Sequence, residues 1–358
     1  MITKLAITNF RGIQSATLEG LSPLTIFVGK NGQGKSTILE AAYIVGNAPN
    51  VNALVYAIAR RGWYGPATWD FLVPAGLAPQ TPDRILSFSM KAQILRDGSN
   101  AVDVQVEGTT SRSYNADIVE RARQEGIKPD IQLTFSLSGD RPGQLTAIAD
   151  AEGRLSTPTA LGPQSKTCLD AAVLLDADSF RRPQRIEQAL SSATVGGWLD
   201  AALSFGRRVV VGLTDIRLVE LHGRPVTMLY YGGGRASIPF HVAGDGVRRI
   251  IELALAVLGG PPGLIAIEEP ENFLHPGSRK ICADVIWAAV QRGEQVLVST
   301  HNLDLMDDLL GLNGSTPRDV EKVAVFRVSL VNGTLQAIRI PGKDAKDSRE
   351  ILGQDLRT

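Results

Sequence analysis

The sequence predicts an α/β fold with a mixed sheet as its core and an antiparallel β lobe inserted into it. A glycine-rich segment at residues 29–36 lies between an apolar run and a stretch of helix formers. A second apolar run, at residues 264–267, ends directly in two glutamates and has the character of a buried parallel strand. Between these features, residues 80–160 alternate apolar and polar side chains, as antiparallel strands with one buried face do.

The first elements lead into a phosphate-binding loop. Short strands are expected over residues 4–12, 15–18 and 24–28. Residues 37–45 are helix formers that end at Gly46. The loop between them matches G-x-x-x-x-G-K-[ST], in which backbone N–H groups and a helix N-terminus surround a polyphosphate. We expect Lys35 to reach the outer phosphates and Ser36 to ligate Mg²⁺. The residues predicted to bind a nucleotide are Gly29, Lys30, Asn31, Gly32, Gln33, Gly34, Lys35, Ser36 and Thr37.

The next segment predicts a β-rich lobe. Strands are expected around residues 85–90, 102–106 and 131–135, turns at 97–98 and 139–140, and a helix over 114–126. We therefore expect an inserted lobe at 51–165, between an N-terminal part (1–50) and a C-terminal part (166–358) of one nucleotide-binding domain. No segment sustains an a/d heptad pattern, which argues against a long coiled-coil arm.

The C-terminal part alternates strands and helices. Strands are expected over 172–176, 219–221, 227–231, 264–267 and 295–299, helices over 185–206, from 244–246 onward and over 276–292, and a hairpin around Asn332 and Gly333. This order places several strand ends at one edge of a sheet.

Two of those strand ends carry candidate catalytic side chains. Glu268 and Glu269 follow the apolar run 264–267, and His301 follows the run 295–299. Adjacent carboxylates at such an edge suit triphosphate hydrolysis, so we assign Glu268 to the Mg²⁺ shell and Glu269 to the attacking water. His301 could hydrogen-bond a γ-phosphate. The alternative is an acidic, solvated surface loop and a structural histidine.

Bulk composition narrows the class of protein. Of 358 residues, 44% are hydrophobic and 21% charged, and no apolar stretch approaches the roughly 20 residues of a membrane span. The N-terminus has no export signal, so the cytoplasm is expected. Cys168 and Cys282 fit no metal-ligand spacing and are expected to be reduced. Lys and Arg number 37, as do Asp and Glu, so the net charge is zero. This balance does not support nucleic-acid binding by overall charge, although a local basic patch remains compatible with it.

The order of these motifs resembles the ABC ATPases, and more narrowly their SMC/RecF/OLD-like branch. The residues that carry the resemblance are the opening Leu5, Ile7, Asn9, Phe10, Arg11 and Gly12, the acidic strand end Glu268, Glu269, Pro270, Glu271, Leu274, His275 and Pro276, the signature-like Gly244, Asp245 and Gly246, and the terminal residues 353–357. The acidic segment is similar to the OLD-like form.

The resemblance implies that two copies sandwich two ATP molecules. Each phosphate loop would face the other copy's Gly244, Asp245 and Gly246, giving a homodimer or a higher homo-oligomer. Arg11 would approach the nucleotide phosphates. Gly244 stands where the family has a serine, which leaves backbone N–H groups, the helix dipole and Arg248 or Arg249 to meet the γ-phosphate. The glutamine of the Q-loop is unassigned among Gln80, Gln93 and Gln105.

The resemblance also predicts a role. OLD proteins carry a Toprim nuclease domain, whereas only a hairpin and a tail are expected after His301. We therefore expect a stand-alone ATPase head that senses for, or regulates, a separately encoded effector, as in phage defence. One alternative is a RecF-like DNA-repair ATPase that uses Arg181, Arg182 and Arg185 on DNA phosphates. A second is a slow, ATP-dependent scaffold.

Overall fold

A short strand, β3 (Leu24–Val28), is buried at all five residues and lies in the parallel half of the main sheet. The computed structural model describes residues 1–48, 50, 52–60, 86–96, 100–111, 116–138, 143–150, 155–156, 169, 172–233, 237–259, 263–312 and 316–357. Cys168, Gln80 and the turns predicted at 97–98 and 139–140 lie outside these residues.

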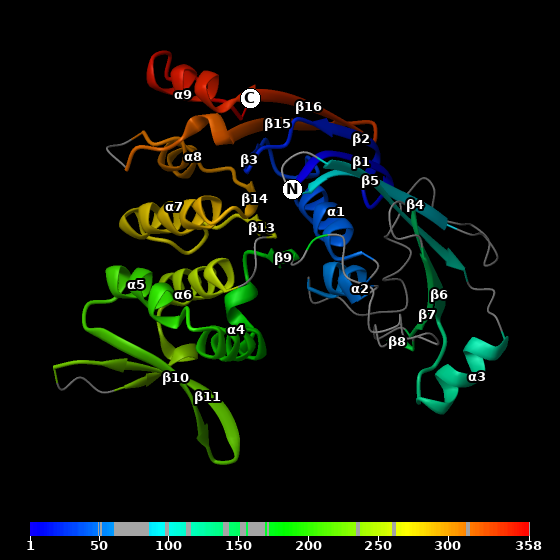
Figure 1. Ribbon diagram of the computed structural model, residues 1–358, viewed down its shortest axis with the longest axis horizontal. Coiled ribbons are helices and arrows are strands. Elements are labelled where there is room, and N and C mark those ends of the chain that lie inside the picture. Colours follow the sequence, from blue (N-terminus) through cyan, green and yellow to red (C-terminus); the bar gives the residue numbers. More distant parts are fainter. Residues whose placement is uncertain are drawn as a thin grey trace.

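The strands of the described residues form one large mixed sheet and one small antiparallel sheet. The large sheet has the order β8-β7-β6-β5-β4-β1-β2-β16-β15-β3-β14-β13-β9. Its other strands are β1 (Ile2–Phe10), β2 (Ile13–Glu19), β4 (Leu86–Arg96), β5 (Asn100–Ser111), β6 (Ile131–Ser138), β7 (Gly143–Ala149), β8 (Leu155–Ser156), β9 (Ala172–Leu175), β13 (Leu264–Glu268), β14 (Gln295–Ser299), β15 (Val323–Val331) and β16 (Thr334–Pro341). The small sheet contains β10 (Leu213–Leu221), β11 (Arg224–Tyr231) and β12 (Ile238–Pro239), and its hairpin projects from the body at the lower left of Figure 1.

Helices cover both faces of the large sheet. The helices of the described residues are α1 (Lys35–Asn47), α2 (Asn52–Ala59), α3 (Ala116–Gln124), α4 (Pro183–Gly196), α5 (Leu199–Val209), α6 (Asp245–Leu258), α7 (Pro276–Gln291), α8 (Leu303–Leu309) and α9 (Gly342–Glu350), with 3₁₀ turns at Ser179–Arg181, Phe240–Val242 and Val320–Lys322. Figure 1 shows α5, α6 and α7 stacked together, with α1 beside β13 and β9.

Each central strand contributes to two cores because successive side chains point to opposite faces. In β3, Ile26 joins the core beneath α6 and α7, whereas Phe27 joins the core with α1. In β13, Ile267 and Ala266 divide in the same way. This two-sided burial explains the continuous apolar runs in the sequence and fixes the register of the strands that carry the site.

The predicted fold class is confirmed. β9, β13, β14, β3 and β15 pair in parallel, and β4 to β8 form an antiparallel ladder. That ladder joins the rest of the sheet through the pairing of β1 with β4. The division of the chain into three parts, at 1–50, 51–165 and 166–358, stays a prediction.

The helix predicted over 185–206 is two helices, because Gly197 adopts φ 79° and ends α4. The sequence did not predict α2, α8 or α9.

The helices are short. The longest in the described residues is α7, with 16 residues, so this part of the chain has no long coiled-coil arm. None of its helices combines the length and the apolar character that a bilayer crossing needs.

One buried carboxyl should make stability depend on pH. Burial raises the pKa of Glu294, just before β14, to about 7, and Arg292 opposes this only in part. The folded state therefore keeps a proton that the unfolded chain releases near pH 4.5, so the free energy of unfolding should fall as pH rises toward 7. Glu294→Gln should stabilise the protein at pH 8 and have less effect at pH 5, as measured by urea midpoints. An equal effect at both pH values would contradict this assignment.

Candidate functional site

Three parallel strands bring the predicted site together. β3, β14 and β13 are neighbours, and Phe27 pairs with Ser299, which pairs with Glu268. The phosphate loop follows β3, Glu269 follows β13, and Thr300 and His301 follow β14. Segments far apart in sequence therefore meet at one sheet edge, as open α/β sheets place their ligand sites.

The loop conformation requires its glycines. Gly29, Gly32 and Gly34 have φ values of 145°, 76° and 85°. A Cβ on Gly29 would lie 2.4 Å from the carbonyl oxygen of Val328, so only glycine fits there. Gly34 is the N-cap of α1, so the positive end of the helix dipole faces the loop.

The loop borders a pocket of about 300 Å³. It is lined by Gly12, Ile13, Asn31, Gly32, Gln33, Gly34, Lys35, Ser36, Thr37, Glu269 and Leu330. Backbone N–H groups and a helix N-terminus at such a pocket suit phosphate groups. The Gln33 side chain accepts a hydrogen bond from the Leu330 N–H at 2.6 Å, which ties the loop to β15.

Lys35 is buried against its own loop. Its Nζ donates to the carbonyl oxygens of Gly29 (2.7 Å) and Lys30 (2.9 Å). Burial lowers the pKa of Lys35, although Glu269, Glu271 and Glu268 oppose this effect. The ammonium is thus held at the pocket, where an outer phosphate would be a stronger partner than two neutral carbonyls.

Ser36 and Glu268 form an oxygen pair that fits Mg²⁺. The Ser36 hydroxyl donates to Glu268 Oε1, so the two oxygens lie next to each other beside the loop. Hydroxyl and carboxylate oxygens are the hard ligands that Mg²⁺ takes, usually together with phosphate oxygens and water. The second carboxylate oxygen, Glu268 Oε2, accepts from Arg60 at 2.6 Å.

Glu269 lies in a strained conformation directly after β13. Its φ is 43°, a region that non-glycine residues rarely occupy. Asn272 Nδ2 donates to Glu269 Oε2 at 2.9 Å, and His301 Nδ1 lies 3.2 Å from Oε1. The carboxylate is 26% exposed and lines the phosphate pocket, so it is placed to orient a water molecule there.

A second carboxyl holds the histidine strand end. Glu271 is 7% exposed and accepts hydrogen bonds from the Thr300 hydroxyl and from the His301 N–H. Burial raises its pKa. Glu271 therefore fixes the backbone that presents His301, whose half-exposed ring points toward Glu269.

The signature-like segment does not line the phosphate pocket of its own chain. Gly244 caps α6, and Asp245 pairs with Arg181 at 2.8 Å and with Arg248. The hydrogen bond from Arg181 and, after it, the one from Arg248 lower the pKa of Asp245. A Cβ on Gly246 would lie 3.0 Å from the carbonyl oxygen of Phe273 in the loop after Glu269.

Arg249 is not available to a phosphate. Its side chain is fully buried and donates to the carbonyl oxygens of Asp176 (2.7 Å) and Glu268 (3.1 Å) and to the side chains of Ser179 and Glu252. Of the two arginines considered as partners for the γ-phosphate, Arg249 is therefore ruled out. Its guanidinium instead supports the end of β13 by donating to the Glu268 carbonyl oxygen.

Arg11 is placed beside α1 and α2. In the two-residue turn between β1 and β2 it has φ 52°, its Nε lies 2.5 Å from Glu40 Oε2, and its guanidinium donates to the carbonyl oxygen of Ala57. It does not line the 300 Å³ pocket, so a role on phosphates stays a prediction.

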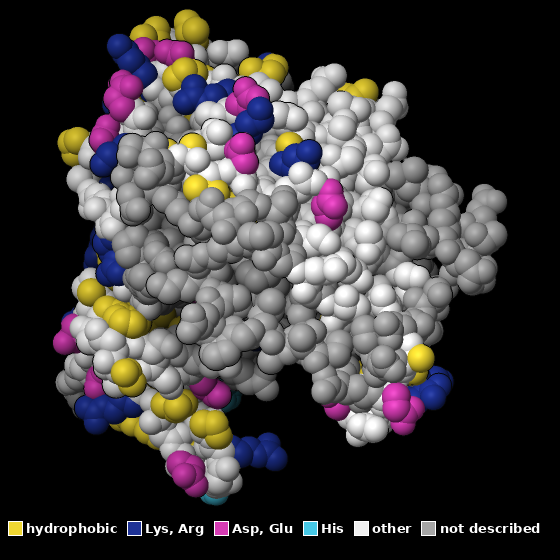
Figure 2. Space-filling view, turned by 45° about the vertical axis from the view of Figure 1, so that its right-hand side comes forward, with side chains coloured by type: hydrophobic (Ala, Val, Ile, Leu, Met, Phe, Trp, Pro, Cys, Tyr) yellow, Lys and Arg dark blue, Asp and Glu magenta, His cyan; other side chains and the backbone are white. Residues whose placement is uncertain are grey.

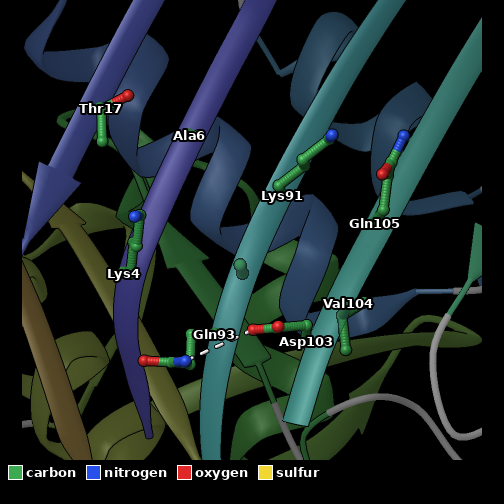
Figure 3. A pocket seen from close by; sticks show the side chains of 9 residues that line it. Lys4, Ala6, Thr17, Lys91, Gln93, Asp103, Val104 and Gln105 are labelled. Atoms are coloured by element: carbon green, nitrogen blue, oxygen red, sulfur yellow. Dashed lines mark hydrogen bonds between the residues drawn. The ribbon is translucent and has the colours of Figure 1, made fainter.

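Two of the candidate Q-loop glutamines lie elsewhere. Gln93 and Gln105 line a separate, open depression of about 570 Å³ on the face of β2, β1, β4 and β5, together with Lys4 and Lys91 (Figure 3). Gln93 bonds Asp103 there. Neither glutamine lines the phosphate pocket.

The sequence missed two buried groups beside the metal-site candidates. Glu40, inside α1, is fully buried, and Arg60, just after α2, has a side chain that is 2% exposed. They pair at 2.6 Å. A glutamate on an otherwise apolar helix face was the one available signal for this pair.

Two family models each match part of the chain. Residues 1–137 match the family described as "AAA ATPase domain". Residues 162–307 match the family described as "AAA domain, putative AbiEii toxin, Type IV TA system". The first match contains the phosphate loop, and the second contains the signature-like segment, the acidic strand end and His301.

One curated relative spans most of the chain, a second matches a short segment, and a solved structure shares the fold. A Helicobacter pylori protein named "ATP/GTP phosphatase" is 22% identical over 335 residues, which cover 86% of this chain and 87% of that protein. The DNA replication and repair protein RecF of Acinetobacter baylyi is 46% identical over 44 residues, 12% of each chain. A solved SMC head bound to the C-winged helix domain of ScpA covers 96% of this chain and 99% of its own, with a TM-score of 0.52 and 14% identity. At that identity the likeness shows the fold alone.

Proposed function

We propose, from the premise that this chain is an ATPase of the SMC/RecF-like branch of the ABC ATPases, that it hydrolyses Mg²⁺-ATP at a site shared by two copies and that a separately encoded partner reads the result. The observation that carries the proposal is the meeting of Lys35, Ser36, Glu268 and Glu269 at one sheet edge.

Each side chain has a distinct part in hydrolysis. Lys35 and the loop N–H groups hold the phosphates and stabilise negative charge on them while the γ-phosphoryl group passes to water and ADP departs. Glu269 orients the attacking water and accepts its proton, with Asn272 and His301 fixing the carboxylate. Ser36 and Glu268 would hold Mg²⁺, which supplies charge neutralisation at the phosphates.

The signature-like segment supports a site shared between copies. Gly244 and the first turn of α6 present N–H groups and a helix dipole, which suit a phosphate, yet they lie outside their own chain's pocket. Asp245 is already paired with Arg181 and Arg248, so its charge opposes an incoming phosphate less. ATP on a second copy is the occupant this arrangement fits. Because ATP would bind the closed pair better than separate copies, it would shift the equilibrium toward the dimer.

Light scattering tests this proposal. Glu269→Gln should bind ATP and hydrolyse it far more slowly than wild type, and its mass should double when Mg²⁺-ATP is added. The matched control is Lys35→Ala combined with Glu269→Gln, which should stay at the mass seen without nucleotide. If ATP changes neither the mass nor the shape of Glu269→Gln, the shared-site mechanism fails.

A protein effector is the partner that we propose. One matching family is described as an AAA domain and putative toxin of a toxin–antitoxin system, and the solved SMC head is bound to a domain of ScpA. The SMC head is a precedent for an ATPase head that acts with another chain. A toxin or nuclease gene beside this one would support the proposal.

DNA repair is the second candidate, favoured by the short RecF match. Against it, Arg182 and Arg185 are bound within the chain, to Asp176 and Glu252. On the face in Figure 2, the described Lys and Arg side chains are interspersed with Asp and Glu. Strong, salt-dependent affinity for DNA would reverse this ranking.

A further inference from the structure

We propose that Arg60 is a positioning residue for the metal site: it holds one oxygen of Glu268 so that the other faces Ser36. This inference rests on the proposed function, because it assumes that Ser36 and Glu268 hold Mg²⁺. Arg60 belongs to none of the motifs in the sequence. It comes from the segment after α2, whereas Glu268 ends β13.

The two oxygens of Glu268 have separate partners. Oε2 accepts from Arg60 Nη1 at 2.6 Å, and Oε1 accepts from the Ser36 hydroxyl. Because Arg60 binds Oε2, rotation of the carboxylate would break this hydrogen bond. The Ser36-facing oxygen is therefore preset in position.

Arg60 is itself held on its other side. Its Nη2 donates to Glu40 Oε1 at 2.6 Å, and Glu40 Oε2 lies 2.5 Å from Arg11 Nε. Asp176 lies 3.6 Å from Arg60 Nη1. A chain of contacts thus runs from the β1–β2 turn through α1 and Arg60 to the metal-site carboxylate. Because the Arg60 and Glu40 side chains are 2% and 0% exposed, water screens these charges little.

Charge gives a second reason for the arrangement. Glu268 and Asp176 both lie beside Arg60 Nη1, at 2.6 and 3.6 Å. Arg60 supplies a fixed positive charge, and its planar fork can bind Glu40 and Glu268 at once. A lysine in its place has a single nitrogen and could hold only one of them well.

Metal affinity separates positioning from simple structural support. With Mn²⁺ as the probe and ADP present, Arg60→Met should weaken Mn²⁺ binding about 10–100-fold, the usual cost of losing a partner of a metal ligand. Affinity for ADP without metal should change little. In turnover, the Mg²⁺ concentration for half-maximal activity should rise by a similar factor, while kcat at saturating Mg²⁺ largely recovers.

Two further variants keep the test decisive if Arg60→Met folds poorly. Arg60→Lys keeps the charge and should give an intermediate loss of Mn²⁺ affinity. Arg60→Met combined with Glu40→Gln removes the buried carboxylate that would otherwise lose a partner. The matched control is Arg185→Met, which removes an arginine whose side chain is 21% exposed and which pairs with the buried Glu252.

The outcomes distinguish this inference from the proposed function. If Glu268→Gln weakens Mn²⁺ binding but the Arg60 variants do not, the positioning role is wrong and the metal site stands. Equal weakening in Arg185→Met would also overturn the role. If Glu268→Gln itself leaves Mn²⁺ affinity unchanged, the proposed metal site fails.

Discussion

Replacing Glu269 by glutamine is expected to lower kcat for ATP about 10²–10⁴-fold, the range that a general base contributes. The amide keeps the size of the side chain and can still meet Asn272 and His301, so the pocket should keep its shape. It cannot accept a proton from water. ATP affinity should stay within a few-fold of wild type, and phosphate release together with nucleotide binding measures the two effects separately.

Asp304→Asn is the matched control for this variant. Asp304 lies three residues after His301, is 64% exposed and pairs with Arg279, outside the phosphate pocket. Its neutralisation should leave kcat unchanged. Full activity in Glu269→Gln would remove the carboxylate from the mechanism and favour the scaffold, in which assembly rather than turnover is the output.

Replacing Arg249 by methionine is expected to lower the free energy of unfolding by about 3–5 kcal/mol, the cost of breaking one side of a buried ion pair. Arg249 is 0% exposed, and its loss would leave the buried Glu252 carboxylate with fewer partners and the carbonyl oxygens of Asp176 and Glu268 without this donor. Burial already raises the pKa of Glu252. Urea unfolding at neutral pH measures the loss.

Its neighbour provides the control. Arg248 is 14% exposed and pairs with Asp245, which is 33% exposed, so Arg248→Met should cost less stability than Arg249→Met. Arg249→Met combined with Glu252→Gln should recover part of the loss, since no buried charge is then left unbalanced. Equal losses in the two single variants would show that Arg249 is not the brace of this strand end.

The sequence could predict those parts of the site whose residues lie close together in the chain. The phosphate loop and the acidic strand end each combine a motif with an adjacent apolar run, so their position on strands was readable from neighbouring residues. Arg60 and Glu40 belong to no motif, and Glu40 stands out only as a charged residue on an apolar helix face. Their ion pairs join segments 20 and 208 positions apart, and only the folded sheet brings them together.

The missed helices have a similar explanation. α9 buries only Gly342 and Ala345 and so has no apolar stripe, and α8 is seven residues long. The merging of α4 with α5 has a different cause. Their helical patterns run together in sequence, and the break depends on Gly197 adopting a left-handed conformation, which is a property of the folded chain.

The place of β3 in the sheet has a consequence for how the chain folds. Leu24 pairs with Val296 on one side and Val323 on the other, so both neighbours of this early strand come from the last part of the chain. During synthesis, the strand that carries the phosphate loop must wait for nearly the whole protein before either edge is covered. Such non-local pairing slows folding and leaves an apolar edge exposed meanwhile. We therefore expect the nascent chain to depend on chaperones until β14 and β15 have left the ribosome.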